Sequence, residues 1–298
     1  MKMICFRSCS CDSQALARHK DTRSGRGAGA VSASPMEGMA LCEVLKLTFN
    51  ITKSHPVHAS SFDSAVDVLF KILKHEKIQE KPLDQPVNLL VNALLNFDLK
   101  AGKNDELLLP EEDLEEGVEK LITILDAAIV AYPEDELDPY IAPLVTLLRK
   151  IYRAAPDRVR EMLESALLPG DSERHEPLGK SDTLSSRLLK ISTSALNPNL
   201  RDLIPLTLLE MSENDTLKLI KNIGYGYASG FLMRNNMPIP EGYLNPSREK
   251  GKAGMAKDTL INPVTGQRLD AEPQDTGPPM TEEEKQREAE RLFVLIER

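Results

Sequence analysis

Apolar residues recur three and four positions apart in one segment after another between residues 41 and 232. This spacing places them on one face of an α-helix, whereas a half-buried strand would alternate apolar and polar residues. In residues 114–130 the spacing holds over about four turns, at Leu114, Val118, Leu121, Ile122, Leu125, Ala128 and Ile129. Prolines and glycines such as Pro133 and Pro169-Gly170 separate the segments, and residues 100–230 show no strand-like alternation. The sequence therefore predicts an all-α fold.

Two of the helical segments carry an asparagine in matching contexts. Asn50 ends the stretch LTFN and Asn92 ends LLVN, and the two positions are 42 residues apart. Between them, residues 62–75 form another amphipathic segment. Armadillo and HEAT repeats have periods of about 40–47 residues and hold two or three helices each. The spacing predicts an armadillo/HEAT-like α-solenoid, in which successive repeats stack side by side.

Both asparagines are candidate partner-binding residues. In armadillo arrays the inner helices line a concave groove, and an amide there can bind the backbone of a bound segment as donor and acceptor. The alternative is that each asparagine satisfies a carbonyl near the C-terminal end of its own helix. Because Asn50 and Asn92 are one repeat period apart, we expect both to face the groove.

A glycine-rich stretch, residues 221–233 (KNIGYGYASGFLM), follows a short predicted helix at residues 215–223. Gly224 lies where a left-handed C-cap glycine is expected. Gly226 and Gly230 then interrupt an apolar and aromatic run, which suggests a close backbone approach or a positive φ angle. Glycines can also cradle a phosphate, but the spacing GxGxxxG differs from GxGxxG and a helix precedes it, not a strand. We therefore expect an end cap of the helical stack, formed by Gly224, Tyr225, Gly226, Gly230 and Phe231.

Residues 235–279 change character, because prolines and glycines interrupt every potential element. A compact domain rarely holds so long a segment without secondary structure, so we predict a flexible arm. Thr281 and Glu284 then form a capping box that starts a last amphipathic helix, residues 280–298. Its apolar face, Leu292, Phe293 and Ile296, must pack on a surface of this chain or of a partner.

Residues 1–36 are rich in Ser, Gly and Ala and carry more basic than acidic side chains. Three cysteines (Cys5, Cys9 and Cys11) lack the paired C-x₂-C spacing of zinc sites, and the segment lacks the amphipathic period of a transit peptide. We predict a disordered or atypical N-terminal extension. The predicted organisation is thus an extension (1–36), a solenoid (37–234), an arm (235–279) and a C-terminal helix (280–298).

Composition and motifs exclude several function classes. The net charge of −9 argues against general nucleic-acid binding, and no apolar run approaches the ~20 residues of a membrane span. The few cysteines fit a reducing compartment. No HExxH, P-loop or nucleophile-elbow motif occurs, so we predict no covalent catalysis, no metal and no cofactor. An interaction protein is the remaining class.

Several segments resemble the synembryn family of cytosolic chaperones and guanine-nucleotide exchange factors for heterotrimeric G-protein α subunits. The resemblance is carried by residues 220–232 with the GYG run, residues 261–266 (INPVTG) and residues 280–285 (MTEEEK), of which the GYG run and INPVTG are the more specific. Residues 43–52 and 87–92 resemble family segments in the same order. The resemblance covers the chain from about Leu41 to its end. It indicates a fungal member that lacks the family's N-terminal repeats.

The resemblance implies a partner and a mechanism. The partner would be a G-protein α subunit, GDP-bound or nucleotide-free, whose C-terminal helix lies in the solenoid groove beside Asn50 and Asn92. Residues 225–231 would cap the stack, and Leu292, Phe293 and Ile296 would anchor the arm on the nucleotide-binding domain. A protein that binds only the empty α subunit lowers its nucleotide affinity by linkage. The expected location is the cytoplasm, or the cell cortex by peripheral association through the partner.

The sequence departs from the family pattern at one place, and an alternative function is also open. Family members often carry a phosphorylatable acidic stretch before INPVTG, whereas residues 241–258 contain Ser247 as their only serine, so phospho-activation is not expected. An armadillo-type scaffold or adaptor that binds an extended peptide without exchange activity is the alternative function. Nucleotide dependence separates the two, because an adaptor would bind the α subunit equally in every nucleotide state.

Overall fold

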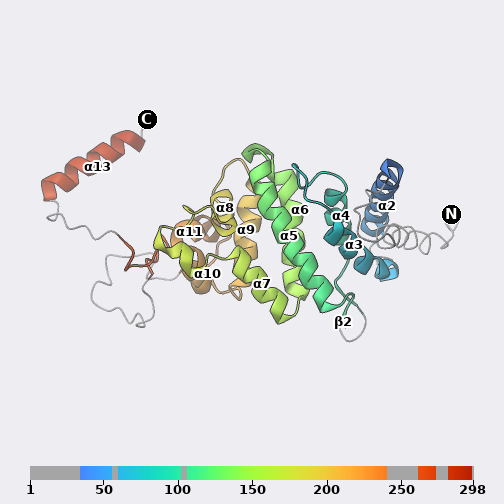
Figure 1. The fold of residues 1–298 in the computed structure, drawn as a ribbon. Coiled ribbons are helices and arrows are strands. Elements are labelled where there is room, and N and C mark those ends of the chain that lie inside the picture. Colours follow the sequence, from blue (N-terminus) through green and yellow to red (C-terminus); the bar gives the residue numbers. More distant parts are fainter. Residues whose placement is uncertain (1–33, 56–59, 102–105, 240–260, 273–280, 297–298) are drawn as a thin grey trace.

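Packed helices make up most of the structure, a computed structural model that describes residues 34–55, 60–101, 106–239, 261–272 and 281–296 (Figure 1). The predicted helical class is thus confirmed. One small departure is an antiparallel pair of two-residue strands, β1 (Lys100–Ala101) and β2 (Glu106–Leu107), with Lys100 opposite Leu107. Strands this short leave no alternation to read, which is why the sequence did not indicate them.

The helices form two layers. The first consists of α2 (Pro35–Ser54), α4 (Val87–Leu95), α6 (Leu137–Ala154) and α9 (Pro198–Met211), each packed on the next. The second consists of α3 (Ser64–His75), α5 (Glu111–Ala131), α7 (Asp157–Leu167) and α8 (Leu184–Ile191), again each packed on the next. Leucine, isoleucine and valine side chains fill the space between the layers, which extend from α2 at one end to α10 and α11 at the other (Figure 1).

Local sequence signals set the helix boundaries. Ser34 and Glu37 form a capping box, so α2 begins at Pro35, earlier than the apolar period alone predicts. Helix α9 begins with Asn197 as its N-cap and Pro198 in its first turn. Pro205 lies inside α9, where its missing N–H leaves the carbonyl of Arg201 without its helical donor.

The helices of the first layer run parallel, with their C-terminal ends along one edge. Asn96, just after α4, donates to the Phe49 carbonyl near the end of α2 (3.0 Å). The Lys150 ammonium of α6 donates to the Leu95 carbonyl at the end of α4 (3.0 Å). Leu95 is the last residue of α4, where a helix leaves carbonyls without a donor, whereas Phe49 lies further inside α2 and its carbonyl accepts from Asn96 as a link between the two helices. Cations and amide donors also offset the negative dipole ends that parallel helices bring together.

The C-terminal end of the stack holds α10 (Thr216–Ile223) and α11 (Tyr225–Arg234), which packs on α9 and α10. The sequence did not predict α11, because Gly226 and Gly230 weaken a helical pattern. Two short 3₁₀ helices, η2 (Glu134–Glu136) and η3 (Asp171–His175), precede α6 and α8. Helix α13 (Glu282–Ile296) starts at the predicted capping box, where Thr281 Oγ1 accepts from the Glu284 N–H (3.3 Å).

Candidate partner-binding surface

The two predicted groove asparagines lie on neighbouring helices of the first layer. Asn50 is exposed on α2, on the side of the helix opposite the buried Leu41 and Leu45. Asn92 is half-exposed on α4, on the side opposite Leu90 and Leu94. Each amide therefore faces outward from the core and can offer both a donor and an acceptor.

A third asparagine, Asn96, joins α4 to α2 and so places Asn50 and Asn92 on the same surface. Asn96 lies one helical turn after Asn92 and donates to both the Phe49 carbonyl and Thr52 Oγ1 of α2, each at 3.0 Å. Asn50 lies between these two acceptors in the chain. The structure therefore assigns different tasks within one stripe: Asn96 joins α4 to α2, whereas neither amide of Asn50 and Asn92 has a hydrogen-bond partner among the described residues.

Further along the layer, charged side chains join α6 to α9. Glu210 of α9 accepts from Arg149 Nη2 (2.6 Å) and from Arg153 Nε (2.9 Å) of α6. The Glu210 side chain is only 10% exposed, whereas Arg153 is 58% exposed. Burial favours the neutral carboxyl, but the bonds from Arg153 and Arg149 outweigh it, so the pKa of Glu210 is lowered. Sequence reasoning missed this network, because its members are 61 and 57 residues apart.

Three segments far apart in the chain meet beside α11. They are residues 171–179, residues 222–227 and residues 261–272, which we call the strap. The Tyr225 N–H donates to the Pro263 carbonyl (2.8 Å) and the Gly226 N–H to the Val264 carbonyl (3.0 Å). Gly224, the N-cap of α11, has no side chain to bind these N–H groups, so the strap caps the helix instead. The two most specific family segments, GYG and INPVTG, are thus in direct contact.

This contact explains two of the predicted cap glycines. A Cβ atom on Gly224 would lie 2.9 Å from the Val264 carbonyl oxygen, and one on Gly226 would lie 3.2 Å from it. Gly224 has φ 79° and ψ 149°, so its φ is positive as predicted, but it is not in the left-handed helical region. Phe231 is buried and Gly230 is exposed on the same helix.

A flexible arm was predicted for residues 235–279, but the strap within it is folded and packed on the body. Asn262 organises it, because its side-chain oxygen accepts from the Val264 N–H (2.9 Å) and its carbonyl accepts from the Gly266 N–H (2.9 Å). Gly266 has φ 69°, which a glycine adopts without strain. Proline and glycine content alone does not distinguish such a folded turn from a linker. The other residues of the predicted arm, 240–260 and 273–279, lie outside the described residues.

A buried arginine holds the strap from the other side. Arg174 of η3 is 5% exposed and donates to the Gly266 carbonyl (3.0 Å) and to the Asn222 carbonyl at the end of α10 (2.9 Å). The Arg268 N–H of the strap donates to the Arg174 carbonyl (2.8 Å). Burial lowers the pKa of Arg174, although the nearby acids Asp171 and Glu173 oppose this.

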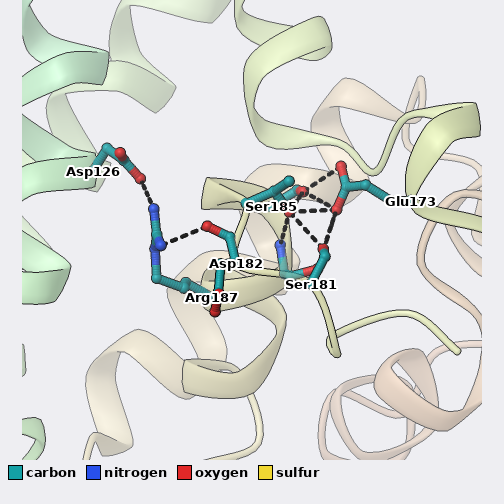
Figure 2. Close-up of polar contacts among 8 residues, drawn as sticks. Asp126, Glu173, Ser181, Asp182, Ser185 and Arg187 are labelled. Atoms are coloured by element: carbon teal, nitrogen blue, oxygen red, sulfur yellow. Dashed lines mark hydrogen bonds and ion pairs between the residues drawn. The ribbon is translucent and has the colours of Figure 1, made fainter. Parts of the chain in front are cut away.

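The neighbouring residue, Glu173, anchors η3 to the N-terminus of α8 (Figure 2). Its carboxylate accepts from the hydroxyls of Ser181, Thr183, Ser185 and Ser186. Burial favours the neutral form, but the hydroxyl bonds and one from the Gly170 N–H outweigh it, so the pKa of Glu173 is lowered. On the other side of α8, Arg187 pairs with Asp126 of α5 (Figure 2).

Leu292, Phe293 and Ile296, the predicted arm contacts, belong to α13, but their side chains lie outside the described residues. The same holds for Cys5, Cys9 and Cys11 of the N-terminal extension. Within the described ranges, no three His, Cys, Asp or Glu side chains gather as metal ligands would. In those ranges there is also no helix with the length and apolar character needed to cross a membrane.

The chain is similar to several known proteins. A family model described as guanine nucleotide exchange factor synembryn matches residues 8–298. A synembryn-like chaperone of Schizosaccharomyces pombe is 24% identical, over 87% of this chain and 51% of the relative. Chaperone Ric-8A of Mus musculus is 26% identical, over 86% of this chain and 50% of the relative. The chain thus spans about half the length of the curated relatives it matches.

Proposed function

This chain belongs to the synembryn family, and from that membership we propose that it is a guanine-nucleotide exchange factor and folding chaperone for heterotrimeric G-protein α subunits. The observation that carries the proposal is the family match over residues 8–298. The chain would bind the nucleotide-free α subunit in preference to the nucleotide-bound form. Binding energy that is available only in the empty state lowers nucleotide affinity by the same amount, and the chain itself supplies no covalent chemistry.

We assign the groove to the outer face of the first helical layer. The two layers, with parallel helices in the first, support an armadillo/HEAT-like solenoid. The outward-facing amides of Asn50 and Asn92 would bind the backbone or the polar side chains of the α subunit's C-terminal helix. Glycines and aromatics at residues 224–231 would close the stack at its other end.

The C-terminal helix α13 would supply the second contact. Leu292, Phe293 and Ile296 share one face of this helix by their spacing, and an amphipathic helix binds by placing such a face in a groove. Its proposed target is the nucleotide-binding domain of the α subunit. Through this partner the chain would work in the cytoplasm and at the cell cortex.

The first test is nucleotide release from a purified α subunit, measured with and without this chain. A version ending at Pro279, which lacks α13, is the matched control. If the full chain speeds release and the truncated chain does not, exchange is supported and α13 takes part in it. If neither chain changes release or binds the α subunit, the proposed function is wrong.

A second candidate is an adaptor that binds an extended peptide and exchanges nothing. The outward-facing amides of Asn50 and Asn92 favour it, because they need only a peptide backbone as partner. An adaptor would bind the α subunit's C-terminal peptide and would bind the GDP-bound and empty subunits equally. Affinities measured in the two nucleotide states therefore decide between the candidates.

A further inference from the structure

We propose that the strap fixes the root of the C-terminal arm at the end of the helical stack, with Arg174 as its positioning residue. Helix α13 would then move on a tether of nine residues, 273–281, in place of the 47 residues, 235–281, that separate it from α11. The inference rests on the proposed function, because it concerns how α13 reaches the same partner as the groove.

Hydrogen bonds attach the strap to two separate parts of the body. On α11, the N–H groups of Tyr225 and Gly226 donate to the strap at 2.8 and 3.0 Å. On the η3 loop, the Leu178 N–H donates to the Thr265 carbonyl (3.1 Å). The Gln267 side chain donates to the His175 carbonyl (2.9 Å). Attachment at two places restricts both the position and the direction of the strap.

The strap also fits the body closely. Gly266 and Gln267 are buried in it, and a Cβ atom on Gly266 would overlap the Leu178 side chain. Asn262 further closes the turn, because its N–H donates to the Gln267 carbonyl (2.6 Å). A turn that is already closed loses less conformational entropy when it docks. The strap is therefore built as a docked element.

Arg174 connects the strap to the helical body. Its guanidinium bonds the carbonyls of Gly266 in the strap and Asn222 in α10, so one buried cation spans both. If the strap left, this guanidinium would lose an acceptor inside the protein. Hydrogen bonds from a charged donor contribute more than those between neutral groups, so this contact favours the docked state.

Chain length turns this attachment into a limit on α13. From Glu272 to Glu282 the chain spans at most about 35 Å, whereas from Arg234 it could span roughly 165 Å. Effective concentration falls as about the −3/2 power of tether length, so the shorter tether raises it about tenfold near the end of the stack. A partner held in the groove would thus meet α13 at a defined place.

The tether length can be measured without any partner. The four native cysteines are replaced, and donor and acceptor dyes are attached at Met233→Cys on α11 and Arg287→Cys on α13 for energy-transfer measurements. Gly266→Val releases the strap, because its side chain would overlap Leu178 at a positive φ. Leu269→Ala, at an exposed strap residue, is the control.

With the strap docked, the root-mean-square span of the tether is about 17 Å, and with the strap released about 38 Å. We therefore expect high transfer in the parent chain and in Leu269→Ala, and a broad, lower distribution in Gly266→Val. Arg174→Met should shift the distribution in the same direction, and Arg174→Lys should partly restore it. Equal transfer in the parent and in both release variants would overturn the proposal.

Binding to the nucleotide-free α subunit gives a second readout. Insertion of 38 Gly/Ser residues after Thr276 keeps the strap docked but restores a 47-residue tether. Both this insertion and Gly266→Val should weaken binding about tenfold and leave binding of the α subunit's C-terminal peptide unchanged. Unchanged affinity in the insertion variant would overturn the proposal. If no version binds the α subunit, the proposed function fails. The energy-transfer measurement still tests whether the docked strap shortens the tether of α13.

Discussion

At the scale of single residues, three asparagines on one surface have different environments. Asn50 and Asn92 face solvent, whereas Asn96 donates two hydrogen bonds to α2. The sequence indicated the first two by their 42-residue spacing. It did not indicate Asn96, because its partners, Phe49 and Thr52, lie in another helix and become neighbours only through packing.

Alanine substitutions should separate binding from stability at these positions. We expect Asn50→Ala and Asn92→Ala each to weaken binding of the α subunit's C-terminal peptide about fivefold, the loss of one net hydrogen bond, without lowering stability. Asn96→Ala should instead lower the free energy of unfolding by about 1–2 kcal/mol. Peptide titrations and urea unfolding measure the two effects. Asn50 and Asn92 variants that bind normally would remove both residues from the groove.

Two partly buried carboxylates with lowered pKa values, Glu173 and Glu210, should govern acid stability. Glu173 and Glu210 are stabilised in their ionised forms, so their contribution is complete above the ordinary glutamate pKa, about 4.3. It is lost as the pH falls through their lowered values in the folded protein. Between about pH 5 and 3, Glu173→Gln and Glu210→Gln should therefore flatten the fall in unfolding free energy. Glu213→Gln, at an exposed surface pair, should leave the slope as it is.

At the scale of helices, replacing a glycine by alanine should have opposite effects on stability at Gly117 and at Gly230. Gly117 lies inside α5, where a Cβ atom would overlap the Phe70 ring of α3. Gly230 is exposed on α11, where a Cβ atom would meet only the Arg234 guanidinium at 3.2 Å. Helix propensity alone would favour alanine at both positions.

We expect Gly117→Ala to destabilise the protein by about 1–3 kcal/mol, because it forces α3 and α5 apart. Gly230→Ala should stabilise it by about 0.5–1 kcal/mol, since the arginine can move away. Urea unfolding of both variants measures the difference. Recovery of stability in the double variant Gly117→Ala with Phe70→Leu would show that the ring is the cause, and stabilisation by Gly117→Ala alone would contradict it.

The elements also show what a sequence can predict. Long amphipathic helices such as α5 and α6 were readable from their apolar period, and α13 from its capping box. Helix α11 and the strap were not, because both depend on each other: the strap supplies the acceptors that α11 lacks. Local propensity carries no record of a partner 38 residues away along the chain. The same holds for the candidate site: the sequence predicted the cap glycines, but it did not predict their contacts with the strap.

At the scale of the whole molecule, each helix packs mainly on its neighbours in the two layers. In such a stack stability is nearly a sum over neighbouring contacts, so damage at one end stays local. The strap lies at the α11 end, and its loss removes the acceptors of Tyr225, Gly226 and Arg174. The other end, α2 with α4, shares none of these contacts.

Two truncations test this locality. A chain ending at residue 239 loses the strap, and a chain ending at Pro279 keeps it. In the shorter chain, amide hydrogen exchange should speed up in α10, α11 and η3, because local opening there no longer breaks the strap contacts. Protection of α4, α5 and α6 should stay as in the full chain, and the longer truncation should resemble the full chain throughout. Loss of protection that spreads evenly to α4 would instead show that the stack unfolds as one cooperative unit, and the strap would then stabilise the entire body.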